Sequence, residues 1–310
     1  MKIHKDSADE RSPSRIQRPS GGQGVVYVVA TPIGNLEDIT LRALKVLETA
    51  DLIAAEKVSR TRALCRHHGI KTRVIGYRRS NSKAVGPALI RRVKGGETVA
   101  LVTDAGTPGV SDPGVCLVSQ ALDEGIKVSP IPGPSAVIAG LSVSGMPSEE
   151  FVFCGFPPNR PGRRKNRLKT MASESRTLVF FEAPHRIESM LRDLREILGD
   201  RKAVVLRELT KAFEEVRRGT ITAILAGLDT DNLRGEFTVV VAGCGKTEAP
   251  EDLGPKVRER LTALLKRGEM SVKDIASLLS TEEGIAFRQA YKACLARKKD
   301  LERIRMNGAQ

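Results

Sequence analysis

The most chemically informative segment of the chain is a loop rich in Asp, Gly and Pro, here called the aspartate loop (Asp104–Gly114). It reads D-A-G-T-P-G-V-S-D-P-G. The carboxylates of Asp104 and Asp112 can accept hydrogen bonds from ammonium, hydroxyl or amide groups, and glycines such as Gly106 let a backbone approach a ligand closely. This composition is typical of a rigid small-molecule site, although the same residue types also form ordinary surface turns.

Two shorter loops repeat this glycine and proline chemistry. One contains Pro32 and Gly34 and follows the apolar run Val25–Ala30; the other ends at Ser135, placed to begin a helix, after the expected strand Lys127–Ile131. The aspartate loop also follows an expected strand. Open α/β sheets bind ligands beyond the carboxyl ends of their strands. Three shaped loops at three strand ends therefore predict a single binding crevice.

The elements that position these loops alternate between strand and helix. Apolar, β-branched runs predict strands over 25–30, 51–55, 73–76, 98–103 and 127–131, and helical spacing predicts helices from Leu41 and over 88–94, 115–122 and 135–141. Such alternation predicts a parallel sheet with helices on its faces. A second α/β unit follows, with strands expected over 151–154, 177–181, 203–206 and 237–242, a helix over 187–198 and an ambiguous segment at 220–228.

We therefore expect an α/β fold with two domains and a small helical appendage. Residues 1–24, rich in Ser, Pro, Gly and charge, are expected to form a disordered basic tail. The first α/β domain is expected over residues 25–145 and the second over residues 146–246. Residues 247–310 are expected to hold a linker and three short helices, which fit either a helix-turn-helix or a structural cap.

Positive charge is the strongest compositional signal. The 310 residues include 51 Lys and Arg against 37 Asp and Glu, a formal net charge of +14. The stretch Lys57–Lys94 holds 12 Lys and Arg and no acid, and Arg160–Lys169 is also basic and acid-free. Solvated faces usually mix both signs, so these stretches favour nucleic-acid binding. The candidate RNA-binding residues are Arg60, Arg62, Arg66, Arg78, Arg79, Arg163, Arg164 and Lys165.

Composition also argues against several classes of protein. The 5 cysteines are scattered without a C-x-x-C pair, which argues against a disulfide framework or a metal site and fits the cytoplasm. No apolar run approaches the roughly 18–20 residues of a membrane span, so we expect no membrane partner. Aromatic residues make up 4% of the chain, with no Trp. We therefore expect RNA recognition through phosphates and shape rather than base stacking.

Six motifs occur in a fixed order along the chain. They are T-P-I-G-N-L-E-D-I-T, the aspartate loop, P-G-P-S-A, E-A-P-H-R (182–186), R-E-L-T-K-x-x-E-E (207–215) and G-E-F-T (235–238). In this order they resemble the ribosomal RNA small-subunit methyltransferase I family, within the tetrapyrrole-methylase-like superfamily that uses S-adenosylmethionine. The resemblance covers roughly residues 24–243, and the three-helix tail resembles the family's helix-turn-helix appendage.

The resemblance implies two α/β domains with S-adenosylmethionine in the cleft between them, and a homodimer. The implied reaction is 2′-O-methylation of a cytidine in the decoding centre of 16S rRNA, within the small ribosomal subunit. The three loops become cofactor loops, and strand ends of the second domain close the pocket. The implied cofactor-binding residues are Pro32, Gly34, Asp104, Gly106, Val110, Asp112, Ser135, Ala183, Leu209 and Phe237.

Two segments depart from the family pattern. Where the family reads A-E-D-T-R-x-T, Glu56 is followed by Lys57, Val58 and Ser59, and an H-N-E triplet is replaced by Ser-Asn-Ser at 80–82. These departures keep a catalytically silent or altered-specificity RNA-binding or ribosome-assembly homologue open as an alternative. A small-molecule methylase acting on a tetrapyrrole is a second alternative.

The nucleophile of the implied reaction, a ribose hydroxyl, is weak and must be activated. A ribose hydroxyl reacts faster when a base or a nearby cation assists it. Glu56, Glu208 and Lys211 each come just after an expected strand and are the candidate catalytic residues. Glu208 and Lys211 also fit a purely structural ion pair.

Overall fold

The protein is described by a computed structural model. Its described residues are 22, 24–228, 234–244, 253–268, 270–285, 287, 290, 291, 293–295, 297, 298 and 301. They belong to two compact units, Met1–Gly243 and Cys244–Gln310. Nearly all of the expected tail 1–24 and most of the expected linker lie outside the described residues.

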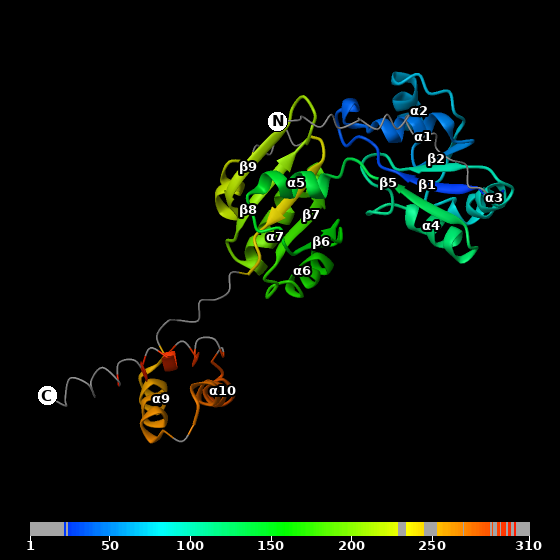
Figure 1. The fold of residues 1–310 in the computed structure, drawn as a ribbon. Coiled ribbons are helices and arrows are strands. Elements are labelled where there is room, and N and C mark those ends of the chain that lie inside the picture. Colours follow the sequence, from blue (N-terminus) through cyan, green and yellow to red (C-terminus); the bar gives the residue numbers. More distant parts are fainter. Residues whose placement is uncertain are drawn as a thin grey trace, which may run out of the picture. The chain divides into compact units, whose positions relative to one another are not determined.

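The first sheet is parallel throughout, as the alternation predicts (Figure 1). Its strand order is β3-β2-β4-β1-β5, formed by β1 (Val25–Val29), β2 (Leu52–Ala55), β3 (Val74–Gly76), β4 (Val99–Val102) and β5 (Lys127–Ile131). Successive strand residues face opposite sides. One face packs against α1 (Leu41–Thr49) and α2 (Val58–His67), and the other against α3 (Ser82–Lys94) and α4 (Gly114–Asp123).

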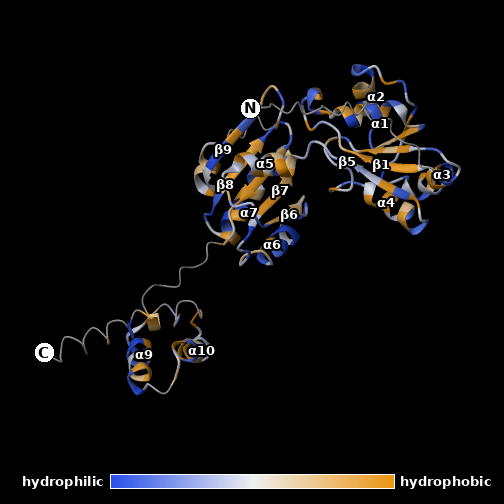
Figure 2. Cartoon of the chain, viewed as in Figure 1, coloured by the Kyte–Doolittle hydropathy of each residue, from blue (hydrophilic) through white to orange (hydrophobic). Residues whose placement is uncertain are grey.

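The second sheet is mixed. Its order is β6-β7-β10-β8-β9, formed by β6 (Phe151–Gly155), β7 (Thr177–Glu182), β8 (Lys202–Arg207), β9 (Glu215–Thr220) and β10 (Phe237–Val241). Only β6 and β7 pair in parallel. One face is covered by α6 (Pro161–Lys169), α7 (Ile187–Leu198) and α8 (Ile221–Ala226). In Figure 2 the inner strands of this sheet, such as β7, are largely hydrophobic, whereas β9 and α6 are largely hydrophilic.

The helix α5 (Ala136–Ser144) covers the other face of the second sheet. Its Val137 and Leu141 pack with strand residues such as Val179 and Val240. A Cβ at Gly140 would lie 3.1 Å from the methyl group of Thr238, so glycine permits this close approach. The expected domain boundary at residue 145 stays a prediction, and α5, which precedes it in the chain, packs on the second sheet.

Two further elements differ from the sequence expectations. The helix α3 begins at Ser82, six residues before the expected start, although it contains Gly86 and Pro87. Gly86 lies against the side chain of Gln120, where a Cβ would be 2.4 Å from Oε1, so its missing side chain lets α3 and α4 pack closely. The edge strand β9 was not predicted, because E-V-R-R-G-T contains no apolar run.

The second unit is a small helical cluster. It contains α9 (Pro255–Arg267) and α10 (Val272–Glu283), and the described residues between Phe287 and Lys298 are also helical. The Ser271 hydroxyl accepts a hydrogen bond from the Asp274 amide at 3.2 Å, which caps the N-terminus of α10. Leu261, Ile275 and Leu279 lie in its core. Across the described part of the chain, no helix is both long and apolar enough to cross a bilayer.

Candidate active site

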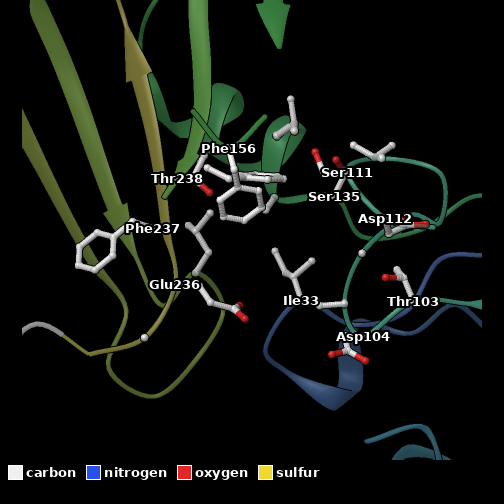
Figure 3. A pocket seen from close by; sticks show the side chains of 18 of the residues that line it. Ile33, Thr103, Asp104, Ser111, Asp112, Ser135, Phe156, Glu236, Phe237 and Thr238 are labelled. Atoms are coloured by element: carbon white, nitrogen blue, oxygen red, sulfur yellow. The ribbon is translucent and has the colours of Figure 1, made fainter. Parts of the chain in front are cut away.

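A cavity of about 420 Å³ opens where the carboxyl-end loops of the first sheet meet the second sheet. Figure 3 shows Asp104, Ser111 and Ser135 on one side of it and Glu236, Phe237 and Thr238 on the other. Most of the expected cofactor and catalytic residues line this cavity, namely Asp104, Gly106, Val110, Asp112, Ser135, Ala183, Leu209, Phe237, Glu56, Glu208 and Lys211.

Asp104 offers an open hydrogen-bond acceptor. Its Oδ2 lies 2.9 Å from Lys57 Nζ and 3.7 Å from an Arg60 guanidinium nitrogen, while the side chain as a whole is only 15% exposed. Its Oδ1 is buried and has no hydrogen-bond partner among the described residues. Because an unsatisfied buried acceptor costs about 1–3 kcal/mol, Oδ1 is suited to an N–H or O–H group of a ligand.

Asp112 lines the cavity and is also bonded to the backbone of its own loop. Its carboxylate accepts hydrogen bonds from the amide of Gly109 at 2.8–2.9 Å and from the amide of Gly114 at 2.6 Å. These bonds fold the aspartate loop back on itself, with Ser111 held at a φ of 68°. Asp112 therefore stabilises the shape of the loop, and both of its carboxylate oxygens already accept hydrogen bonds from backbone amides.

Pro32 and Gly34, expected to bind the cofactor, are not among the residues that line the cavity. Pro32 is buried beside Thr31, whose backbone exchanges hydrogen bonds with Gly106 at 2.9 and 3.0 Å. A Cβ at Gly34 would lie 2.5 Å from Lys211 Cγ, and the Asn35 amide donates to Thr210 Oγ1 at 3.0 Å. The segment at Pro32 thus joins two loops of the first sheet, whereas Gly34 and Asn35 contact the loop after β8 on the cavity's other side.

Glu208 and Lys211 form an ion pair in the cavity wall, with 2.8 Å between Oε1 and Nζ. Burial alone would raise the pKa of Glu208, but hydrogen bonds from Lys211 and from the Glu236 amide lower it overall. Burial alone would lower the pKa of Lys211, but Glu208 and Glu236 raise it overall. Lys211 therefore stays cationic at neutral pH and is a poor proton acceptor.

A glycine makes room for this ion pair. Gly235 has a φ of 91°, and a Cβ there would lie 2.3 Å from a carboxylate oxygen of Glu208. Glu208 itself has a φ of 51° and Thr210 has a φ of 64°, values that are uncommon for non-glycine residues. Backbone strain of this kind persists where surrounding contacts enforce it. The loop after β8 is thus held in one shape with Lys211 directed to the cavity.

Glu56 is fixed by the strand next to it. Its Oε2 accepts hydrogen bonds from the Thr103 hydroxyl at 2.9 Å and from the Asp104 amide at 3.4 Å. The Glu56 carbonyl accepts from Arg78 Nε at 2.9 Å. Two carboxylates and three cations, Lys57, Arg60 and Arg78, therefore gather at this end of the cavity.

The expected RNA-binding residues fall into two groups. The side chains of Arg60, Arg62, Arg66, Arg78, Arg79 and Arg163 are exposed. Arg164 is only 3% exposed and pairs with Asp193 at 2.6 Å, so this arginine is withdrawn from the RNA-binding set. Lys165 is half-buried and pairs with Glu196 at 2.6 Å.

Several wall residues were not anticipated from the sequence, above all Phe156 and Glu182. Phe156 had a detectable signal, since it stands in a G-F-P-P turn directly after an expected strand. Glu182 and Glu236 belong to motifs that were recognised, but nothing in their spacing distinguished them from their neighbours. No group of three His, Cys, Asp or Glu suited to a metal occurs among the described residues.

The fold has clear relatives. Residues 25–225 match the family model of tetrapyrrole (corrin/porphyrin) methylases. Among solved structures, a uroporphyrin-III C-methyltransferase from Thermus thermophilus superposes with a TM-score of 0.53 at 23% identity, covering 71% of this chain and 94% of that one. A cobalt precorrin-4 methyltransferase gives a TM-score of 0.56 at 17% identity, covering 70% and 94%. Fold and cavity together define a methylase of the tetrapyrrole type.

Curated sequences give a closer match. The chain is 42% identical over 278 residues to the ribosomal RNA small subunit methyltransferase I of Pseudomonas aeruginosa, covering 89% of this chain and 98% of that protein. It is 44% identical over 277 residues to the protein of that name from Mesorhizobium japonicum, covering 88% and 92%. The chain belongs to the ribosomal RNA small subunit methyltransferase I family, and its cofactor is S-adenosylmethionine.

The cavity fits this cofactor. The buried Oδ1 of Asp104 suits an amino or hydroxyl donor, and Gly106, which also lines the cavity, adds no side chain to it. Val110, Ala183 and Leu209 supply apolar wall for a ring and an aliphatic chain. When bound, S-adenosylmethionine supplies a methyl group on a cationic sulfonium, which an acid-bearing pocket favours.

Proposed function

We propose that the protein methylates the 2′-hydroxyl of a cytidine ribose in the decoding centre of 16S rRNA, acting on the small ribosomal subunit. The observation that carries this proposal is the close family relationship together with the cationic rim of the cavity. Three relatives named ribosomal RNA small subunit methyltransferase I are 38–44% identical to this chain and cover 87–89% of it. A cytoplasmic homodimer, implied by the family resemblance, is part of the same proposal.

Positively charged side chains supply the RNA contact in this proposal. Lys57, Arg60 and Arg78 surround the cavity end at Glu56, and Arg62, Arg66 and Arg79 continue the exposed basic surface. Contacts between such side chains and phosphates position an RNA without reading its sequence. Methylation of a single nucleotide then depends on which ribose reaches the cavity.

The residues in the cavity supply positioning and charge rather than covalent chemistry. Holding the ribose oxygen close to the methyl donor can contribute several kcal/mol. The Lys211 ammonium stabilises negative charge that develops on that oxygen. The Glu56 carboxylate, oriented by the Thr103 hydroxyl, is the candidate acceptor for the departing proton. Glu208 keeps Lys211 charged and in place.

The direct test uses small subunits from cells that lack this protein. Purified protein and labelled S-adenosylmethionine are added, and 2′-O-methylated positions are mapped along the 16S rRNA. The proposal predicts one new modified cytidine in the decoding centre. Methylation of a base, or of another nucleotide, would contradict the proposed specificity. Binding of the cofactor and the subunit without any transfer would favour the silent-homologue alternative.

A further inference from the structure

The proposed reaction assigns no role to the aromatic residue Phe156. It lines the cavity and its side chain is 55% exposed, although Phe is normally buried. In Figure 3 it is labelled between Thr238 and Ser111, in the middle of the cavity wall. An exposed ring in a cavity wall has an open face toward whatever the cavity holds.

The backbone before Phe156 is shaped to turn this ring into the cavity. The pairing of β6 with β7 shifts register between Phe153 and Gly155, which is a bulge, and Gly155 has a φ of 63°. Bulges next to functional sites redirect side chains. A Cβ at Gly155 would lie 3.3 Å from Ser111 Oγ, so the turn also lies close against the aspartate loop.

Other aromatic rings support Phe156 from behind. Its centroid is 5.5 Å from that of Phe181 at an interplanar angle of 56°, and Phe181 lies 5.0 Å from Phe153. Such tilted and edge-on contacts fix ring orientation. One face of Phe156 is thereby supported by protein, which leaves the other available to a ligand.

A buried charge pair fixes the turn that follows Phe156. The Arg186 guanidinium donates to the carbonyl of Pro157 at 2.6 Å and to Asn159 Oδ1. Arg186 in turn pairs at 3.1 Å with Glu182, which is 1% exposed. Two prolines, Pro157 and Pro158, restrict the same turn. The position of the ring is therefore set before any ligand arrives, which lowers the entropic cost of stacking on it.

We infer that Phe156 is a stacking platform for a nucleobase bound in the cavity. This inference rests on the proposed function, which brings two nucleobases to the site: the adenine of the cofactor and the base of the target nucleotide. Both present the same flat π-face, and stacking on an aromatic side chain is worth roughly 1–3 kcal/mol per base.

The chain contains no Trp, so a single Phe156→Trp substitution gives a site-specific fluorescence probe. The probe is titrated in one arm with S-adenosylhomocysteine and in the other with protein-free 16S rRNA. Quenching by either ligand supports the inference, and the effective ligand identifies which base stacks. Phe213→Trp is the matched control, because Phe213 is 83% exposed and does not line the cavity. Equal quenching in the control would overturn the inference.

Affinity measurements cover the case in which Trp does not fit. We expect Phe156→Leu to weaken binding of one of the two ligands roughly five- to a hundredfold, as loss of one stacked base implies. Phe156→Tyr, which keeps the ring, is expected to stay within about twofold of the unmutated protein. Unchanged affinity of Phe156→Leu for both ligands would overturn the inference.

Methyl transfer by the unmutated protein, measured in parallel, separates the two proposals. Transfer to the expected cytidine with no effect at Phe156 counts against stacking alone. A clear stacking effect without transfer to that cytidine counts against the proposed function alone.

Discussion

Lys57 Nζ lies 2.9 Å from Asp104 Oδ2, so a lysine occupies one side of the carboxylate whose other oxygen is buried and unsatisfied. The resemblance led us to expect an aspartate at this position, and the chain has Lys57 instead. The pair places a positive charge beside a pocket whose cofactor is itself cationic. Lys57 thus compensates Asp104 while leaving Oδ1 for the ligand.

This arrangement predicts opposite effects for the two partners. Asp104→Ala removes the acceptor and is expected to weaken S-adenosylmethionine binding by about 1–3 kcal/mol. Lys57→Met removes a competing charge and is expected to tighten binding about two- to fivefold. Titration calorimetry without RNA measures both. Lys83→Met, an exposed lysine outside the cavity, is the control for loss of one charge. Equal affinities for all four proteins would show that Asp104 does not contact the cofactor.

Lys211 is predicted to act as a cation and not as a base. Because its pKa is raised, it stays protonated as the pH rises past neutrality. Lys211→Met is therefore expected to lose at least tenfold in kcat at every pH, whereas Lys211→Arg should recover part of the rate. Methyl transfer to small subunits at pH 7 to 9 measures this. Recovery of Lys211→Met at high pH, where a free base would suffice, would contradict the assignment.

Glu208 is predicted to act through Lys211. Its pKa is lowered, so the pair persists from neutral pH down to the lowered pKa of Glu208 and is lost only in more acidic solution. Glu208→Gln is expected to reduce kcat less than Lys211→Met does, and to move the acidic limb of the pH–rate profile. An unshifted profile with a full loss of rate would point instead to direct proton transfer by Glu208.

The exposed basic surface is predicted to govern the salt dependence of RNA binding. Charge reversal in Arg62→Glu/Arg79→Glu is expected to weaken binding to small subunits and to reduce the slope of log K against log salt by about 1 per lost phosphate contact. Cofactor affinity should not change. The control is Arg192→Glu, on α7 and paired with Glu188. If the slope of log K against log salt is the same in both variants, the exposed basic surface does not contact RNA phosphates.

The Arg164–Asp193 pair is predicted to be structural. Asp193→Ala leaves a cation that is 3% exposed without its partner at 2.6 Å, which is expected to cost about 3–5 kcal/mol of unfolding free energy. Replacing both residues, in Arg164→Met/Asp193→Leu, should restore most of that loss. Urea unfolding compares the three proteins. A double variant no more stable than the single one would show that the charge itself is not the cause.

Sequence periodicity predicted the first sheet because its central strands β1, β2 and β4 are almost entirely buried and therefore consist of apolar runs. The helix predicted from Leu41 is α1, and the Thr40 hydroxyl caps it by accepting a hydrogen bond from the Ala43 amide at 3.1 Å. The strand β9 was not predicted, because it is an edge strand with charged residues instead of an apolar run. The start of α3 was not predicted, because Gly86 and Pro87 are residues that usually break helices. The glycine is explained by its close packing against Gln120.

The loops of the site were predicted better than the roles of their side chains. Strand ends share an edge in any parallel sheet, so the meeting of the aspartate loop with Ser135 followed from topology. The conformation of the loop decides whether an aspartate bonds to its own backbone. Asp112 does so, whereas Asp104 Oδ1 has no hydrogen-bond partner among the described residues. Arg164 looked like its exposed neighbours because its buried partner, Asp193, lies 29 residues away in the chain.

The hydrogen bond from the Asn35 amide to Thr210 Oγ1 joins residues 175 positions apart. The cavity likewise draws on residues from Ile33 to Thr238. During synthesis, the first sheet can fold while the second still lacks β10, its central strand. A nascent chain in which the whole aspartate loop has been synthesised therefore still lacks part of the wall of the cofactor pocket. Capture of the cofactor becomes possible only after Thr238 has been synthesised, so cofactor binding reports completed folding of the first unit.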